Sequence, residues 1–327
     1  MTRAFEDRCT ALLDDLGLGR GAMAVERLTG GVASDIAAVT VEGRTLCLKF
    51  ALPKLAVAED WYAPVHRSRA EYAWLTVARD ALPEATPELY GFSTRENGFA
   101  MEYVAGPDVY LWKSALMDRA ADRGEAAAVG EAIGRIHAAS TAPGFDAAPF
   151  DNAEDFDALR LDPYLRFTAS RYPRLAGRMT AMADALKGAR VTLVHGDVSP
   201  KNILLRGGWP VILDAECATM GDPAFDMAFC INHLILKGFH MDALRAALLE
   251  RAGALWSAYA PHVTWEDRGA LGARVAALVP MLMLARVDGK SPVEYLDAPT
   301  RDAVRAASIP SILHPVATLS DLMERLT

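Results

Sequence analysis

The sequence predicts an α+β fold of two lobes, in which a small antiparallel sheet precedes a larger, mainly helical region. Two observations lead to this prediction. Over roughly the first hundred residues, short apolar runs alternate with polar and glycine-containing turns, which is typical of strands and hairpins. Beyond Gly106-Pro107 the apolar positions recur mostly at helical spacing. We therefore expect one lobe over residues 1–104 and another over 105–327, with a ligand site between them.

The first lobe is expected to hold five strands and two helices. Residues 4–17 have the spacing of an amphipathic helix that ends at Gly17, and residues 66–80 have helical spacing as well. Glu42-Gly43-Arg44 is typical of a short hairpin turn between two strands. The expected strands are 24–28, 36–41, 45–50, 89–93 and 98–104, with a tight loop at 29–35 and a polar turn at 94–97.

The second lobe is expected to be helical around a short β segment. Residues 120–139 are rich in alanine and have helical spacing, and 153–188 predict two helices that are broken near Pro173. From residue 222 onward the pattern is again helical, and we expect breaks at Pro261, Pro292 and Pro310. The expected β segment consists of residues 192–194, 203–205 and 211–213.

Composition excludes several classes of protein. The chain has 327 residues, of which 52% are hydrophobic, so a sizeable core is expected and bulk disorder is not. The formal net charge of −8 argues against a nucleic-acid partner that is bound through its phosphates. Four scattered cysteines indicate neither a zinc site nor a disulfide framework, and favour a reducing compartment.

We expect a cytoplasmic location and no membrane span. Acidic residues stand near the start of the chain, where a signal peptide would be apolar. The longest apolar stretch, 271–284, is too short to span a bilayer and is interrupted by Arg274. The sequence leaves the oligomeric state open.

The most informative residues follow two apolar runs in the second lobe. Asp197 and Asn202 lie five positions apart in Val194-His195-Gly196-Asp197-Val198-Ser199-Pro200-Lys201-Asn202, and Asp214 follows Val211-Ile212-Leu213. A lone Asp or Asn would most often cap a turn. Together they supply a carboxylate that orients a hydroxyl and two oxygen ligands for Mg²⁺, which is the set that phosphoryl transfer needs. Glu216 is a further candidate metal ligand.

The first lobe contributes candidate nucleotide contacts. Gly30 and Gly31, between two strands, would let backbone amides approach phosphates. Lys49 lies in an apolar strand and needs a buried partner, for which Glu71 on the next helix is the candidate. This ion pair would place the lysine on the α- and β-phosphates of the nucleotide. Backbone groups at Glu102 and Val104 would meet the adenine edge, and Ser34 and Ser199 complete the predicted cofactor contacts.

These segments resemble the aminoglycoside phosphotransferase/choline kinase-like superfamily, whose members are distant relatives of protein kinases. The motif His195-Gly196-Asp197-x-x-Pro200-x-Asn202 is similar to its catalytic loop, and Ile212-Leu213-Asp214-x-Glu216 to its metal-binding segment. Gly221-Asp222-Pro223-x-x-Asp226 and the helix over 130–137 are similar too, so the resemblance covers roughly residues 20–240.

The resemblance implies a bilobal, protein-kinase-like fold that uses ATP or GTP with Mg²⁺. It assigns the catalytic carboxylate to Asp197, and it implies that Asp226 holds the catalytic loop by hydrogen bonds. Gly196 stands where protein kinases have Arg, and Ser199 where they have a catalytic-loop Lys. No stretch between Glu216 and Asp222 is long enough for an activation loop. These departures favour a small-molecule hydroxyl acceptor over a protein.

The acceptor is not fixed by the sequence, and three functions stay open. The first is a kinase for a sugar, an amino alcohol or a related metabolite. The second is a kinase that modifies an aminoglycoside or macrolide antibiotic. An acidic cluster would bind a cationic acceptor, but a solvated helix start, with acids at its positive end, is the favoured interpretation. The third is a nucleotide-binding regulator without turnover. The candidate acceptor residues are acids (Asp151, Glu154, Asp155, Asp157), aromatics (Trp256, Tyr259, Trp265, Tyr295) and other polar residues (Asn232, His233, Arg286).

Overall fold

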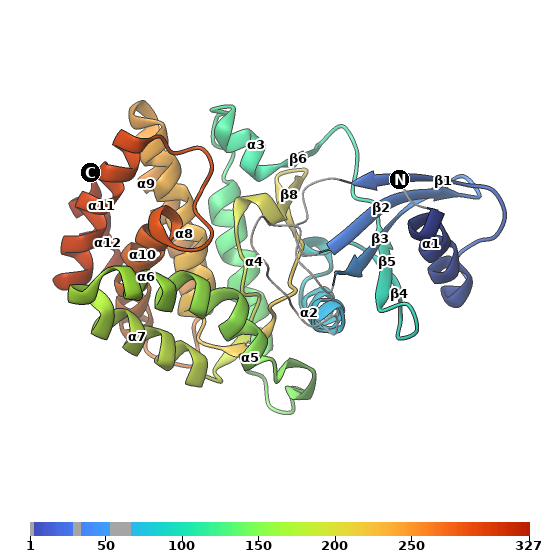
Figure 1. Cartoon of the computed structure of the whole chain (residues 1–327), viewed down its shortest axis with the longest axis horizontal. Coiled ribbons are helices and arrows are strands. Elements are labelled where there is room, and N and C mark those ends of the chain that lie inside the picture. The colour runs from blue at the N-terminus through green and yellow to red at the C-terminus, as the bar shows by residue number, and fades with distance from the viewer. Residues whose placement is uncertain (1–2, 29–33, 53–66) are drawn as a thin grey trace.

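The protein consists of a sheet-containing lobe and a larger helical lobe that lie side by side (Figure 1). A computed structural model describes residues 3–28, 34–52 and 67–327. The N-terminus lies with the sheet, and the C-terminus lies at the far end of the helical lobe. The α+β fold expected from the sequence is therefore confirmed.

The first lobe is built on a five-stranded antiparallel sheet in the order β1-β2-β3-β5-β4. The turn between β2 and β3 has positive φ at both Glu42 (50°) and Gly43 (78°), which is the backbone of a two-residue hairpin turn and confirms the prediction there. The elements of this lobe are α1 (Arg3–Leu16), β1 (Met23–Leu28), β2 (Ser34–Val41), β3 (Arg44–Ala51), α2 (Arg67–Ala81), η1 (Pro83–Ala85), β4 (Leu89–Ser93) and β5 (Gly98–Glu102).

The two faces of this sheet are covered by different helices. Successive side chains of a strand point to opposite faces, so Leu48 and Phe50 of β3 pack with α1. Cys47 packs on the other side, with Trp74 of α2, in a cluster that continues into the helical lobe. The same alternation places Lys49, two residues after Cys47, on the face that carries α2 and meets the helical lobe.

The helical lobe surrounds two small sheets, β6-β8-β9 and β7-β10. Its first elements are β6 (Val109–Leu111), α3 (Trp112–Met117), α4 (Glu125–Ala139), η2 (Ala148–Phe150), α5 (Ala153–Phe156), η3 (Asp157–Arg166), α6 (Phe167–Arg171) and α7 (Pro173–Gly188). The others are β7 (Thr192–Val194), η4 (Pro200–Asn202), β8 (Ile203–Arg206), β9 (Trp209–Ile212), β10 (Thr219–Gly221), α8 (Ala224–His240), η5 (Asp242–Leu244), α9 (Arg245–Tyr259), η6 (Ala260–His262), α10 (Arg268–Asp288), α11 (Ala298–Leu313) and α12 (Leu319–Leu326).

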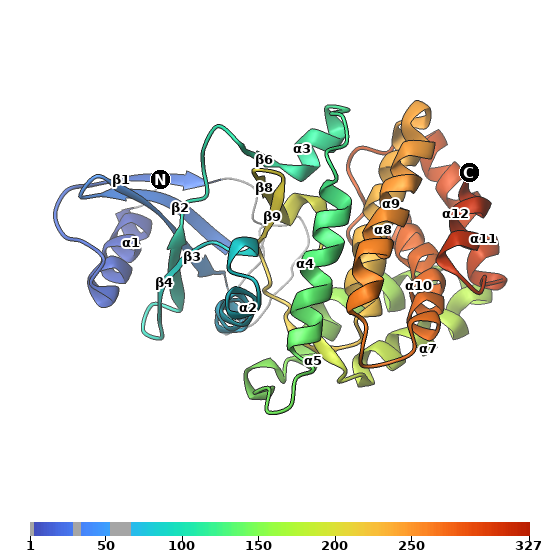
Figure 2. The ribbon, with the colours of Figure 1, turned by 180° about the vertical axis from the view of Figure 1, so that it is seen from behind.

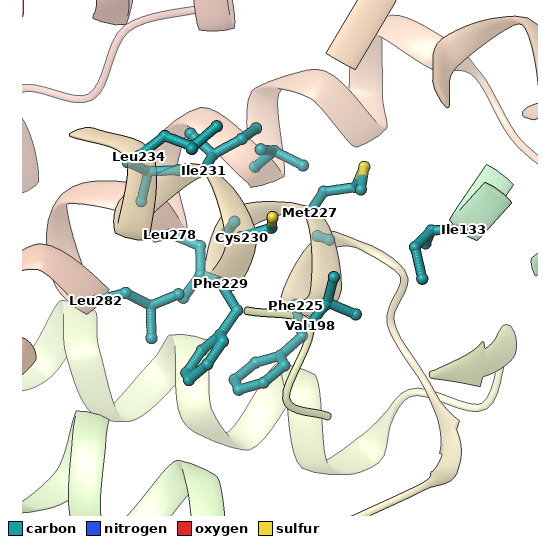
Figure 3. Close-up of a cluster of buried hydrophobic side chains, with 14 of the residues drawn as sticks. Ile133, Val198, Phe225, Met227, Phe229, Cys230, Ile231, Leu234, Leu278 and Leu282 are labelled. Atoms are coloured by element: carbon teal, nitrogen blue, oxygen red, sulfur yellow. The ribbon is translucent and has the colours of Figure 1, made fainter. Parts of the chain in front are cut away.

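Helix α8 forms the centre of the helical lobe. Figure 3 shows the rings of its Phe225 and Phe229 side by side, and Leu278 and Leu282 of α10 belong to the same buried cluster. Helix α10 is long and apolar enough to cross a membrane by length and composition, but 72% of its apolar window is buried inside the protein. This burial identifies α10 as a core helix.

Several boundaries differ from the sequence-based expectation. The helix predicted over 120–139 begins only at Glu125, after Gly124 with a φ of 88°. The strand predicted over 98–104 ends at Glu102. Strand β6 and helix α3 were not predicted, because each is held by pairing or packing rather than by its own pattern.

The proline predictions are right in part. Pro173 does separate two helices, as the first residue of α7, where its missing N–H costs nothing. Pro310 does not break its helix: α11 continues through it to Leu313, and burial of Ser311 and Ile312 holds this last turn in place. The segment after Asp157 is a π-helix that contains Pro163, and its wide turns accommodate the proline.

Helices α4 and α9 run side by side (Figure 2) and approach so closely at Gly130 that no side chain fits there. A Cβ at this position would lie 2.1 Å from the carbonyl oxygen of Leu255. We expect Gly130→Ala to lower the free energy of unfolding by about 1–3 kcal/mol, because the helices must separate. Gly177 lies on the exposed face of α7 with open space around it, so Gly177→Ala should instead raise the free energy of unfolding by about 0.5–1 kcal/mol. Urea unfolding of both variants tests this contrast; equal effects would contradict it.

Candidate active site

The loop that carries Asp197 is held by Asp226 of α8. The backbone N–H groups of His195 and Gly196 donate to the Asp226 carboxylate at 2.7 and 2.8 Å. The hydrogen bonds that the resemblance implied for Asp226 are thus present. Gly196 has a φ of 79°, and a Cβ there would lie 2.8 Å from the Cβ of Cys217, so only glycine fits without strain.

His195 is a positioning residue in this loop. Its Nδ1 accepts from the backbone N–H of Asp197 at 3.1 Å, so its Nε2 carries the proton and donates to the carbonyl of Leu213 at 3.0 Å. Burial lowers the pKa of His195, which keeps the ring neutral. The ring thereby joins the Asp197 loop to the segment that leads to Asp214.

The carboxylate of Asp197 is buried between two cations. Its Oδ2 lies 3.0 Å from Arg160 Nη2 and 3.1 Å from Lys201 Nζ, and its Oδ1 accepts from the Ser199 hydroxyl at 3.3 Å. Burial alone would raise the pKa of Asp197, but the charges of Lys201 and Arg160 outweigh it and lower that pKa. The group is therefore ionised at neutral pH, as a proton acceptor must be.

Lys49 bridges the two lobes. Its Nζ lies 2.7 Å from Glu71 Oε1 on α2 and 2.5 Å from Asp214 Oδ1. The side chain of Lys49 is buried, which disfavours its charge, but the Asp214 and Glu71 carboxylates raise its pKa and hold the ammonium charged. The ion pair between Lys49 and Glu71 that was expected from the sequence is present.

Asp214 and Asn202 present oxygen atoms near the same loop. Asp214 follows β9 with a φ of 70°, a left-handed conformation that is uncommon for a residue other than glycine and that aims its side chain toward Lys49. Asn202 Nδ2 donates to the carbonyl of Asp197 at 3.0 Å, which leaves Oδ1 without a partner among the described residues. Its own carbonyl accepts from Leu213 N–H at 2.9 Å, which ties the two segments together.

These donors fit Mg²⁺, which prefers oxygen ligands and usually takes one or two from the protein, with the rest from water and substrate phosphates. In the described part of the chain, no group of three or more His, Cys, Asp or Glu forms a preformed metal cage. Glu216 is buried, and its Oε2 lies 2.9 Å from Arg67 Nε. Its role as a metal ligand stays a prediction.

The other predicted cofactor residues are placed differently. Gly30 and Gly31 lie outside the described residues. Ser34 begins β2 opposite Ala51. The remaining positions are Glu102, Val104 and Ser199. The Glu102 backbone N–H donates to the carbonyl of Glu88 at 2.7 Å, whereas the backbone of Val104 forms no hydrogen bond within the described residues. Ser199 is fully buried, with its hydroxyl on Asp197.

Sequence analysis missed two residues that contact Asp197. Lys201 stands inside the motif four positions after Asp197, so its spacing was a usable signal. Arg160 gave none, because it reaches Asp197 from the π-helix η3, whose extra-wide turns are set by tertiary packing. Its Nε also donates to the carbonyl of Gly196 at 2.7 Å.

Comparison with known proteins matches this arrangement to a family. The model of the phosphotransferase enzyme family matches residues 24–262, which is well over half of the chain. The chain belongs to the phosphotransferase enzyme family. The match ends somewhat beyond the residues on which the sequence resemblance was based. Among curated proteins there is no match.

Solved structures give the same fold for this family member. A choline/ethanolamine kinase family protein from Mesorhizobium loti is 19% identical over 99% of both chains, with a TM-score of 0.54. The amicoumacin kinase hAmiN, solved with AMP-PNP and Ca²⁺, is 15% identical over 98% of this chain and all of its own, with a TM-score of 0.57. Choline kinase from Cryptosporidium parvum is 10% identical over 92% of this chain and 93% of its own, with a TM-score of 0.55. At these identities the likeness shows the fold alone.

Proposed function

We propose that this protein is a kinase that transfers the γ-phosphoryl group of ATP, with Mg²⁺, to a hydroxyl of a small molecule. The observation that carries the proposal is the convergence of Lys49, Asp197, Asn202 and Asp214 from both lobes. An intact set of this kind favours an enzyme over a regulator without turnover. We place the nucleotide in a lobe of residues 1–104 and the acceptor in 105–327, in a cytoplasmic protein with no nucleic-acid partner.

In this proposal each residue of the site has one role. Lys49 binds the α- and β-phosphates, and Glu71 holds Lys49 in place. Asn202 Oδ1 and the Asp214 carboxylate would hold Mg²⁺, which neutralises charge on the phosphates when it is bound. Gly30, Gly31 and Ser34 would line the phosphates, and backbone groups at Glu102 and Val104 would meet the base of ATP, or of GTP.

Asp197 acts on the acceptor. Its ionised carboxylate accepts a hydrogen bond from the acceptor hydroxyl and so aligns that oxygen with the γ-phosphorus. As the new O–P bond forms, the bond from the γ-phosphorus to the β-phosphate oxygen breaks. The hydroxyl proton then passes to Asp197. Arg160 and Lys201 position the carboxylate and keep it ionised before the transfer.

An aminoglycoside acceptor is not favoured by the acidic cluster over 151–157. Glu154 and Asp157 both pair with Lys187 of α7, at 2.8 and 2.9 Å. Asp157 also pairs with Arg166. These contacts join α7 to α5 and η3, so both carboxylates already have cationic partners within the helical lobe.

Phosphoryl transfer from ATP to a panel of hydroxylated metabolites and antibiotics tests the proposal. The wild-type protein is compared with and without Mg²⁺, and ³¹P NMR identifies the product. Metal-dependent formation of a phosphate ester would support the kinase. If the protein binds nucleotide but neither transfers phosphate to any acceptor nor hydrolyses ATP slowly, the regulator without turnover is favoured.

The ionisation of Asp197 predicts a pH effect. Lys201→Met removes a cation that lies 3.1 Å from Asp197 Oδ2, so the pKa of Asp197 rises. Since the deprotonated carboxylate is the active form, the acidic limb of the kcat/KM profile should move to higher pH. Lys290→Gln, which removes a cation paired with exposed Asp162, should leave the profile unchanged. A uniform loss of rate without a shift of the limb would contradict this role of Lys201.

A further inference from the structure

Lys237 of α8 is a buried cation. Its side chain is 1% exposed, and it forms no ion pair among the described residues. The ammonium lies 3.5 Å from the carbonyl of His233 and 5.3 Å from the centre of the Tyr295 ring. Burying an unpaired ammonium costs free energy, and hydrophobic packing alone gives no reason for a lysine at this position.

Other basic residues gather around Lys237 from separate elements. Burial lowers the pKa of His233, and the charges of Arg286, Lys237, Lys201 and Lys113 lower it further. Burial and the charges of Lys113 and Arg286 likewise lower the pKa of Lys237 to about 8. We call Lys113, Lys201, His233, Lys237 and Arg286 the basic cluster; they come from α3, η4, α8 and α10.

Among the residues that the structure describes, two carboxylates pair with this basic cluster. Glu294 pairs with Lys113 at 2.6 Å, and Asp197 pairs with Lys201 at 3.1 Å. Arg286, like Lys237, has no ion pair in the described part of the chain. Its Nη1 donates to Ser291 and to the hydroxyl of Tyr164.

Several buried polar atoms in the basic cluster, and one on Tyr295 beside Lys237, lack hydrogen-bond partners among the described residues. They are Arg286 Nε, His233 Nε2 and the hydroxyl of Tyr295. His233 is 6% exposed, so no bulk water replaces the missing partner. Buried polar groups in folded proteins are rarely left unpaired, and such a group indicates a missing ion, water or ligand.

The basic cluster reaches the site of phosphoryl transfer. Lys201 belongs to both the basic cluster and the candidate active site, since its Nζ forms an ion pair with the Asp197 carboxylate. Tyr164 bonds Arg286 at 3.2 Å, and four residues earlier in the same π-helix Arg160 binds Asp197. The side chains of Lys113 and Lys201 are 35% and 45% exposed, so these two cations of the basic cluster meet solvent.

We propose that the acceptor carries an anionic group, which is a carboxylate or a phosphate. The basic cluster binds this group while the hydroxyl of the acceptor donates a hydrogen bond to Asp197. This inference rests on the kinase function proposed above. An anion would pair with Lys237 and Arg286 and accept hydrogen bonds from the unpartnered donors. A cationic acceptor such as choline or an aminoglycoside would meet like charge at this position.

A binding experiment on the full chain tests this proposal. Protein saturated with AMP-PNP and Mg²⁺ is titrated by calorimetry with citrate and inorganic phosphate as anions, and with choline and glucosamine as cations. We expect one or both anions to bind and the cations not to bind. The two anions distinguish carboxylate from phosphate recognition. Binding of a cation in preference, or of neither anion, would overturn the proposal.

Two variants locate the anion. The first variant, Lys237→Met, keeps the length of the side chain and removes the buried charge, so the fold should be retained. The second variant, Arg286→Gln, removes the other charge that has no ion pair among the described residues. Each should weaken anion binding about tenfold or more, because a charge-assisted hydrogen bond is lost. Lys290→Gln is the matched control and should bind like the wild type. Equal anion affinity in all three variants would place the anion elsewhere and overturn the proposal.

The same experiment separates this proposal from the kinase function. If AMP-PNP does not bind, the kinase function fails, and titration of the nucleotide-free protein still decides whether the basic cluster takes an anion. If AMP-PNP binds and neither anion does, the anionic acceptor fails and the kinase function stands.

Discussion

Asp197→Asn is expected to lower kcat for phosphoryl transfer by about 10²–10⁴-fold, which is the effect of removing a positioned general base. Asparagine has nearly the same shape as aspartate, so the loop should keep the hydrogen bonds to Asp226 and Asn202. What is lost is the negative charge that accepts the proton of the acceptor. The measurement is steady-state transfer from ATP, with KM for ATP determined in parallel.

The KM for ATP should change little in this variant, because Lys49 and Asp214 are unaltered. Asp297→Asn is a matched control: Asp297 caps helix α11 by accepting from Thr300 N–H at 2.9 Å, and asparagine caps helices equally well. If Asp197→Asn were as active as this control, Asp197 would not be the group that acts on the acceptor.

Asp214→Asn is expected to lower kcat/KM by about 10³-fold, because metal stabilisation of the transferring phosphoryl group contributes several kcal/mol. Asparagine tolerates the left-handed backbone that Asp214 adopts, with its φ of 70°, so the variant should fold. It leaves Lys49 paired with Glu71 at 2.7 Å.

The dependence of rate on Mg²⁺ distinguishes this loss from a general one. With the weaker amide ligand, Asp214→Asn should need a higher Mg²⁺ concentration for half-maximal rate, whereas Asp197→Asn should need the same concentration as the wild type. An unchanged Mg²⁺ requirement in Asp214→Asn would show that Asp214 does not hold the metal.

The elements of the fold that the sequence predicts well have strong local signals. The hairpin at Glu42-Gly43 follows from turn chemistry, and α7 begins at Pro173 as expected. Strand β6 and helix α3 were missed because three and six residues carry little periodicity of their own. The break expected at Pro310 did not occur, since tertiary burial of the last turn outweighs the local effect of proline.

The same distinction applies to the candidate site. Asp197, Asn202 and Asp214 lie in short motifs, so their proximity follows from the sequence. Arg160 and the basic cluster are assembled from separate elements, and apart from Lys201, which stands four positions after Asp197, no spacing along the chain indicates them. The sequence named His233 and Arg286 as candidate acceptor residues, but for a histidine in an apolar helix a hydrogen-bonded core position is the more common outcome. The structure instead leaves His233 Nε2 without a partner within the described residues.

The most direct test of the central claim is a titration of the wild-type protein with ATP in the presence of Mg²⁺ and again in the presence of EDTA. The account predicts saturable binding that is clearly tighter with Mg²⁺, because Asn202 and Asp214 would then hold a metal that neutralises charge on the phosphates. No binding of ATP or GTP under either condition would contradict the account, since Lys49, Glu71 and Asp214 would then not form a nucleotide site.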